Sequence, residues 1–153
     1  MQLSFSGQEQ VPAPPAMVWA FVSDPQRVAA CLPGVQDVRV VGERELEVGV
    51  PLQAGLLRGT LKARVHIEPD ENAGQVRVRI SGGGLGSSLD VTALSAVVDQ
   101  GNGTTRLDWQ GAATLGGPLA KMGGKAIEPR VHAMIARTFS NMSAAIARGD
   151  RLA

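Results

Sequence analysis

The chain has 153 residues, 44% of them hydrophobic, which is enough for one domain with its own apolar core. With 15 Lys and Arg against 14 Asp and Glu, its net charge of +1 gives no electrostatic basis for binding nucleic acid. One cysteine and two histidines exclude an internal disulfide and a closed zinc site. The composition therefore predicts a single globular domain with no structural metal and no nucleic-acid partner.

The sequence contains no segment typical of secretion or membrane insertion. Residues Met1–Val11 have neither a basic segment nor an apolar stretch, so they do not resemble a secretory signal. The longest uncharged stretch, Gln10–Ser23, includes three prolines and is well short of the roughly 20 apolar residues that a spanning helix needs. We therefore expect a cytoplasmic protein.

The first third of the chain predicts one strand followed by two short helices. Residues 3–6 alternate between apolar residues and serine, as a strand does. Pro14-Pro15 precedes an apolar run typical of a helix, because helices tolerate proline in their first turn. Asp24-Pro25 provides an N-cap and a first helical residue for the second helix, and Pro33-Gly34 ends it.

From Val35 to Leu115, apolar residues alternate with polar ones, which is the pattern of strands with one solvent-exposed face. Turn residues separate these strands at hairpin spacing and predict an antiparallel meander. Between Ala93 and Val98 the alternation of apolar and polar residues changes phase, as it does at a β-bulge. The sequence therefore does not decide which residues of this segment face inward. The inward candidates on the clear strands are Val38, Val48, Val50, Leu61, Ala63, Val65, Val78 and Ile80.

From Pro118 onward, apolar residues recur every three or four positions, which predicts a long amphipathic helix. Pro129 and Gly123-Gly124 predict a kink or break near its start. An antiparallel sheet of about six or seven strands must curl, and only this helix has a stripe long enough to cover its concave face. The predicted fold is α+β: a curved sheet wrapped around the C-terminal helix, with two short helices after the first strand. The residues expected between the sheet and this helix are aliphatic and not bulky aromatic ones, which predicts a cavity between the sheet and the helix.

Several blocks of sequence resemble the START-like (SRPBCC) helix-grip superfamily and, within it, the family of the carbon monoxide dehydrogenase G subunit. Val11–Phe21, Asp24-Pro25 and Cys31–Val35 resemble the family's first helix, its Asp-Pro turn and its Leu-Pro-Gly exit. Gly103–Trp109 resembles the Gly-Thr-x-Arg-x-x-Trp stretch, and Ala120–Met142 resembles the closing helix. The similarity covers nearly the whole chain.

The resemblance implies a single START-like (SRPBCC) ligand-binding domain over residues 1–153. It implies a non-catalytic protein with a hydrophobic cavity, accessory to a molybdenum hydroxylase of the carbon monoxide dehydrogenase type. The implied ligand is an apolar small molecule such as a quinone or lipid, with no covalently bound cofactor. The implied location is cytoplasmic and peripheral at the inner membrane face, with the membrane surface as a partner.

The candidate ligand-binding residues combine inward strand positions, the closing helix and both tryptophans. For the methionines, ligand contact and ordinary core packing remain alternatives, and each tryptophan either caps the cavity or anchors the core. These candidates are Trp19, Val48, Val50, Ala63, Val65, Val78, Trp109, Met122, Met134, Ile135, Phe139 and Met142.

Two other function classes remain as alternatives. Cys31, His66 and His132 lie on three different predicted elements with no motif joining them, so we predict neither a catalytic nor a metal site. A cyclase- or hydrolase-like enzyme of the same superfamily needs an acid that points inward. The acids available for this are Asp90, Asp108 and Glu128. A co-chaperone-like interaction domain instead predicts a filled core and a partner on the outer sheet.

One predicted hairpin carries a basic outer face. Lys62, Arg64, His66, Arg77 and Arg79 share the solvent side of their two strands. Such a face is either an ordinary solvated surface or a docking site for an anionic partner or lipid headgroups.

Overall fold

One curved antiparallel sheet and one long helix make up most of the molecule. The computed structural model describes residues 1–54 and 57–149; the remaining residues of the predicted domain, 55–56 and 150–153, lie outside the described part. The strands are β1 (Gln2–Val11), β2 (Gln36–Gly42), β3 (Glu45–Ala54), β4 (Leu57–Asp70), β5 (Gln75–Gly84), β6 (Ser87–Gly101) and β7 (Thr104–Gly116). The helices are α1 (Pro15–Val22), α2 (Pro25–Ala30), α3 (Pro118–Lys121) and α4 (Gly124–Ala147).

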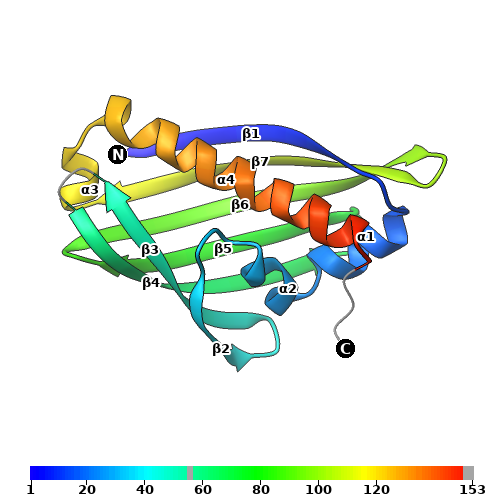
Figure 1. Cartoon of the computed structure of the whole chain (residues 1–153), viewed down its shortest axis with the longest axis horizontal. Coiled ribbons are helices and arrows are strands. Elements are labelled where there is room, and N and C mark those ends of the chain that lie inside the picture. The colour runs from blue at the N-terminus through cyan, green and yellow to red at the C-terminus, as the bar shows by residue number, and fades with distance from the viewer. Residues whose placement is uncertain (55–56, 150–153) are drawn as a thin grey trace.

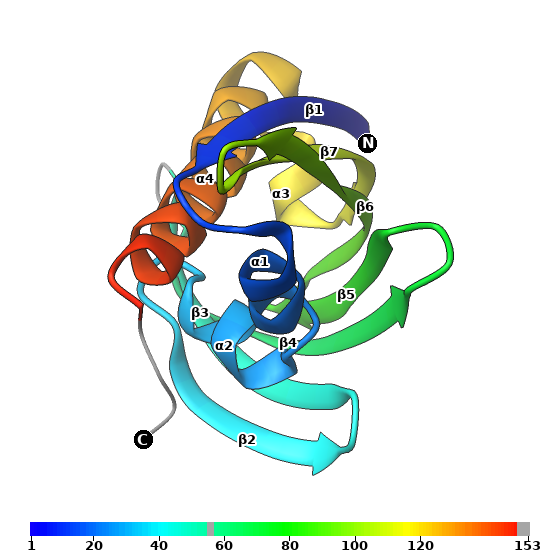
Figure 2. The same cartoon turned by 90° about the vertical axis from the view of Figure 1, so that its right-hand side faces the viewer.

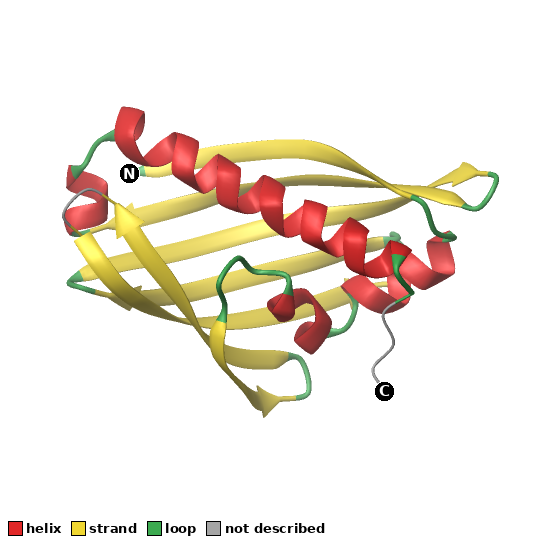
Figure 3. Cartoon of the chain, in the orientation of Figure 1, coloured by secondary structure: helices red, strands yellow, loops and turns green. Residues whose placement is uncertain are grey.

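The strands follow the order β1-β7-β6-β5-β4-β3-β2 in a seven-stranded sheet, and each neighbouring pair is antiparallel. Helix α4 lies obliquely across the concave face (Figures 1 and 3). Seen from the side, the sheet curls around this helix, and α1 and α2 close one end (Figure 2). The predicted α+β helix-grip fold is therefore confirmed.

Local sequence signals account for the two short helices. The carboxylate of Asp24 accepts hydrogen bonds from the backbone N–H groups of Gln26 (3.0 Å) and Arg27 (3.4 Å), as an N-cap does. Pro15 and Pro25 are the first residues of α1 and α2. The two helices thus begin where the sequence predicts.

The C-terminal helical segment is interrupted before its long part. Helix α3 ends at Lys121, and Gly123 adopts a φ of +83° as the N-cap of α4, a conformation that glycine tolerates best. Pro129 lies inside α4, and the helix continues through it. The predicted break near the start of the C-terminal helix is therefore confirmed, and it lies at Gly123 and not at Pro129. None of the helices in the described part of the chain is both long and apolar enough to span a lipid bilayer.

The prediction of a β-bulge between Ala93 and Val98 is wrong. Strand β6 pairs residue by residue with β7 from Ser88 to Asp99, and the irregularity lies beyond Asp99. The apolar phase changes in the sequence because Ser95 occupies an inward position, while positions 94, 96 and 98 on the outer face are apolar. In the sequence pattern, a polar residue at an inward position therefore looks the same as a shift in strand register.

Val38 was expected to face inward, and this is wrong: it is 43% exposed. Its strand, β2, is an edge strand of the sheet and is exposed along its whole length. Helix α4 packs along β1 at the opposite edge, so its apolar stripe is not available to cover β2. The other inward candidates are buried or half-buried: Val48, Val50, Leu61, Ala63, Val65, Val78 and Ile80.

Two aromatic rings lie over glycines of the neighbouring strand. In the β1–β7 pairing, Phe5 is opposite Gly111 and Trp109 is opposite Gly7. A Cβ atom would lie 2.6 Å from the Phe5 ring if added at Gly111, and 2.5 Å from the Trp109 ring if added at Gly7. Glycine is therefore needed at both positions, because the ring occupies the space of a side chain. Phe139 of α4 stacks on Trp109 with 4.0 Å between the ring centroids.

Hydrogen bonds fix the C-terminal half of α4. The Ser143 hydroxyl donates to the backbone carbonyl of Gln10 on β1 (2.9 Å). The Asn141 amide donates to the carbonyl of Cys31 at the end of α2 (2.9 Å). These contacts hold the helix at its end, while its middle turns lie over the concave face of the sheet.

Candidate ligand cavity

An apolar cavity of about 180 Å³ lies between the sheet and α4. Every described element except β2 contributes to its lining. Among the residues that the structure describes, the lining side chains are all apolar apart from those of Ser95 and Thr138, which carry hydroxyls. The Thr138 hydroxyl donates to the Met134 carbonyl (2.8 Å) within its own helix. The cavity therefore suits an apolar molecule.

Small side chains on the central strands create this space. Val78 and Ala93 lie side by side on β5 and β6, and Ala93 provides little side chain to fill the interior. Val78, Val91 and Ala93 line the cavity and are only half-buried although they belong to the concave face. Protein interiors are normally close-packed, so this row is where the core is left incomplete.

Two exposed lining residues, one on α4 and one on β3, indicate where the cavity opens to solvent. Met134 on α4 and Pro51 on β3 both line it and are exposed, Met134 to 36%. Val131 and Ile135, next to Met134 on the helix, are half-buried lining residues. We call this opening, between Met134 and Pro51, the mouth.

Eight of the twelve predicted binding residues lie together in the cavity lining. They come from β3, β4, β5 and α4, elements that are far apart in sequence. They are Val50, Ala63, Val65, Val78, Met134, Ile135, Phe139 and Met142. Their contact with a ligand stays a prediction.

The other four predicted binding residues lie outside the lining. Trp109 does not line the cavity, but its ring stacks nearly parallel on that of the lining residue Phe139. Val48 is buried in β3, while Trp19 and Met122 are half-buried and pack against the core. Trp109 is part of the buried core, and Trp19 is half-buried and packs against it.

Sequence reasoning missed the contribution of β6. Its lining residues are Leu89, Val91, Ala93 and Ser95. The useful signal was the two-residue turn Leu85-Gly86, which fixes the β5–β6 register in the way that tight hairpins do. With Val78 inward, that register places Ala93 on the same face.

In the described part of the chain, no titratable side chain lines the cavity. Asp108 pairs with Arg106 (2.7 Å), and Glu128 lies 3.6 Å from His132 on the exposed side of α4. Asp90 is exposed. None of the three acids that an enzyme would need is therefore in the lining.

The candidate nucleophile and metal-ligating residues are dispersed. Cys31 is buried at the C-cap of α2, His66 lies on β4 and His132 lies on α4. Within residues 1–54 and 57–149, no three His, Cys, Asp or Glu side chains form a group that could hold a metal ion. No nucleophile–base pair is assembled from these three residues in the described structure.

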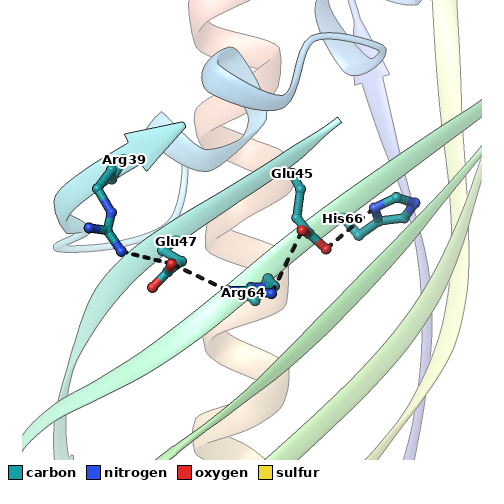
Figure 4. A network of polar contacts seen from close by, with 5 residues as sticks. All are labelled: Arg39, Glu45, Glu47, Arg64 and His66. Carbon is teal, nitrogen blue, oxygen red and sulfur yellow. Dashed lines mark hydrogen bonds and ion pairs between the residues drawn. The ribbon is translucent and has the colours of Figure 1, made fainter. Parts of the chain in front are cut away.

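Two residues of the predicted basic face of the β4–β5 hairpin, Arg64 and His66, lie beside carboxylates of β3 (Figure 4). The Arg64 guanidinium nitrogens lie 3.4 Å from a carboxylate oxygen of Glu47 and 3.9 Å from one of Glu45. The Glu45 carboxylate also lies 3.7 Å from the imidazole Nδ1 of His66. Arg39 reaches Glu47 from β2 at 2.8 Å. The hydrogen bond from Arg39 lowers the pKa of Glu47, and the charges of Arg39 and Arg64 act in the same direction. The carboxylates therefore offset part of the positive charge on this face.

Another set of cations lies beside the mouth. Arg130 and Arg137 are four residues before and three residues after Met134, so all three share one side of α4. Cations outnumber acids along α3 and α4. The charged residues of these helices are Lys121, Lys125, Glu128, Arg130 and Arg137. The mouth thus combines an apolar rim with positive charge.

Solved structures of low sequence identity share the fold. A conserved protein from Geobacillus kaustophilus is 17% identical, with a TM-score of 0.85 over 96% of this chain and 97% of that chain. The Zhui aromatase/cyclase from Streptomyces sp. R1128 is 13% identical, with a TM-score of 0.71 over 99% and 98%. Norcoclaurine synthase from Thalictrum flavum, in complex with dopamine and hydroxybenzaldehyde, is 17% identical, with a TM-score of 0.66 over 99% and 90%.

A START superfamily protein from Mycobacterium smegmatis also aligns, with 17% identity and a TM-score of 0.65 over 95% of both chains. A search of curated protein sequences finds no match. The family defined by the carbon monoxide dehydrogenase G subunit (CoxG) matches residues 7–147, which include nearly all the described elements. The chain therefore belongs to the CoxG family of carbon monoxide dehydrogenase G subunits.

Proposed function

We propose that this protein binds an apolar small molecule without transforming it, and that it serves as an accessory to a redox enzyme. The observation that carries the proposal is the 180 Å³ cavity, whose lining is apolar apart from two hydroxyls. Removing apolar surface from water drives the binding of such a ligand. A lining with no acid or base offers no group for proton transfer.

The volume limits what the cavity can enclose. An apolar cavity of about 150 Å³ binds benzene, whereas pockets for drug-sized ligands usually exceed about 300 Å³. The present cavity suits a ring system or a section of an alkyl chain. A longer tail would leave through the mouth beside Met134. A quinone-like or lipid-like molecule has this form.

Family membership supports a role beside an enzyme of the carbon monoxide dehydrogenase type. In this proposal the partner is a molybdenum hydroxylase, and the protein holds an apolar molecule that the redox reaction or a membrane-linked step uses. Two structural neighbours are named as enzymes, norcoclaurine synthase and an aromatase/cyclase. The lining of this cavity favours binding over such chemistry, and its open volume argues against a filled, co-chaperone-like core.

Native mass spectrometry tests the proposed binding. Protein purified without detergent should carry one apolar molecule, or should take up one molecule of added menadione, because the apolar cavity is preformed. A denaturing spectrum of the same sample is the control that distinguishes a non-covalent ligand from a modification. A bare chain that takes up neither menadione nor lipid would contradict the proposal.

The proposal extends to exchange of the ligand at an anionic membrane surface. Arg130 and Arg137 lie on the same side of α4 as Met134, so a negatively charged lipid surface would meet the mouth and the cations together. Each cation near such a surface contributes about 1 kcal/mol. On the β4–β5 hairpin, the carboxylates of Glu45 and Glu47 offset part of the charge of Arg64 and His66.

Replacing both arginines, Arg130→Gln with Arg137→Gln, should weaken binding to vesicles of phosphatidylcholine and phosphatidylglycerol by roughly 30-fold, which corresponds to about 2 kcal/mol. Sedimentation with these vesicles measures the effect, and added salt should reduce wild-type binding. The matched control is Arg77→Gln with Arg79→Gln on the hairpin. A larger loss in the control pair would assign membrane docking to the hairpin instead, and equal binding to pure phosphatidylcholine would exclude an electrostatic contact.

A further inference from the structure

One side-chain hydroxyl that lines the cavity, that of Ser95, is not used in the hydrogen bonds of the described fold. Ser95 belongs to the concave face of β6, lines the cavity and is only 5% exposed. Among the residues that the structure describes, none forms a hydrogen bond with its hydroxyl. The other lining hydroxyl, that of Thr138, already donates to the Met134 carbonyl. The Ser95 hydroxyl is therefore available to the cavity, where a bound ligand can supply the hydrogen bond that the protein does not.

The surroundings of Ser95 restrict what that ligand can be. Its cross-strand neighbours on the same face are Val76 and Trp109, and Trp109 stacks on the lining residue Phe139. The Ser95 hydroxyl therefore lies next to an aromatic pair, in a lining whose other hydroxyl, that of Thr138, is already bonded within α4. A hydroxyl donates one hydrogen bond and accepts others, which suits a carbonyl or a hydroxyl on the ligand.

An ionised ligand group does not fit this position. No Lys, Arg or His of the described chain lines the cavity. Burying a carboxylate without a cation or several donors is strongly unfavourable, so a fatty-acid carboxylate would have to remain outside, at the mouth. A pure hydrocarbon would bind but would leave the Ser95 hydroxyl without a partner.

We propose that Ser95 is the hydrogen-bonding contact of the cavity and that the ligand is a neutral apolar molecule carrying a carbonyl or hydroxyl group at its buried end. This inference rests on the proposed function, because it names the ligand class of the same cavity. The polar end of the ligand lies at Ser95, near Phe139, and the apolar remainder extends toward the mouth.

Three probes with related carbon skeletons test the proposal: menadione carries ring carbonyls, methylnaphthalene carries none, and naphthoate carries an ionised carboxylate. The wild type should bind menadione most tightly and naphthoate most weakly. Ser95→Ala should weaken menadione binding by about three- to ten-fold, the usual effect of losing one hydrogen bond, and should leave methylnaphthalene binding unchanged. Isothermal titration calorimetry gives the affinities, and melting curves show that each variant is folded.

Thr92→Val is the matched control, since it removes a hydroxyl from the exposed outer face of the same strand, outside the cavity lining. It should not change the ratio of menadione to methylnaphthalene affinity. Equal effects of Ser95→Ala on the two probes, no effect on either, or tightest binding of naphthoate would overturn the assignment of Ser95 while leaving apolar binding intact. Failure of the wild type to bind any probe would instead overturn both this inference and the proposed function.

Discussion

Ala93→Phe should reduce the affinity for menadione at least about ten-fold, a loss of 1.4 kcal/mol or more, while the protein remains folded. Ala93 lines the cavity beside Val78 of the neighbouring strand. A phenyl ring added there occupies the space that the ligand would fill. Overpacking a filled core costs about 1–3 kcal/mol, but here the added ring enters open volume, so the stability cost should be smaller. Calorimetric titration and urea unfolding measure the two effects.

The adjacent residue provides the control for this prediction. Leu94 belongs to the outer face of β6, so Leu94→Phe adds a ring to the same strand outside the ligand cavity. It should leave menadione affinity nearly unchanged. Unchanged binding by Ala93→Phe, or equal losses in the two variants, would show that the ligand does not occupy this cavity.

Phe139→Ala should lower the free energy of unfolding by about 3 kcal/mol, at the lower end of the range for Phe→Ala in filled cores. The ring is 7% exposed and stacks on Trp109, so its removal deletes core packing. It also borders the cavity, so part of its surface already lacks a packing partner. We expect weaker menadione binding as well, because the variant enlarges the cavity and removes one of its walls. Thermal and urea unfolding with and without menadione measure both quantities.

Met134→Ala is the comparison on the same helix. Met134 lines the mouth and is 36% exposed, so its truncation should cost only about 1 kcal/mol. Equal destabilisation by the two substitutions would mean that the middle of α4 is packed uniformly. In that case the opening between α4 and β3 would not be a feature of the folded protein in solution.

Much of this fold could be predicted from the sequence because its signals are local. The Asp24 cap, the glycine before α4 and the alternating strands each depend on a few neighbouring residues. An amphipathic stripe as long as that of α4 has only the concave face of the sheet to cover. The inward positions of Ala63, Val65 and Val78 follow from the same alternation.

The remaining features depend on contacts between distant segments. Val38 alternates like a buried position, yet its strand lies at the edge that α4 does not cover. Ser95 breaks the apolar pattern, and only its pairing with Val76 and Trp109 places it inward. The support of Phe139 by Trp109 similarly requires the glycine at position 7 on β1. Periodicity identifies the faces of an element and does not determine which other element covers them.

Methyl-resolved NMR during a menadione titration tests most directly whether the cavity binds an apolar molecule. The methyl signals of the lining residues Val78, Val91 and Ile135 should shift together and saturate at one molecule per chain. The signals of Val98 on the outer face and Val40 on β2 should stay in place. Shifts confined to the outer-face methyls, or none at any menadione concentration, would contradict binding in the cavity.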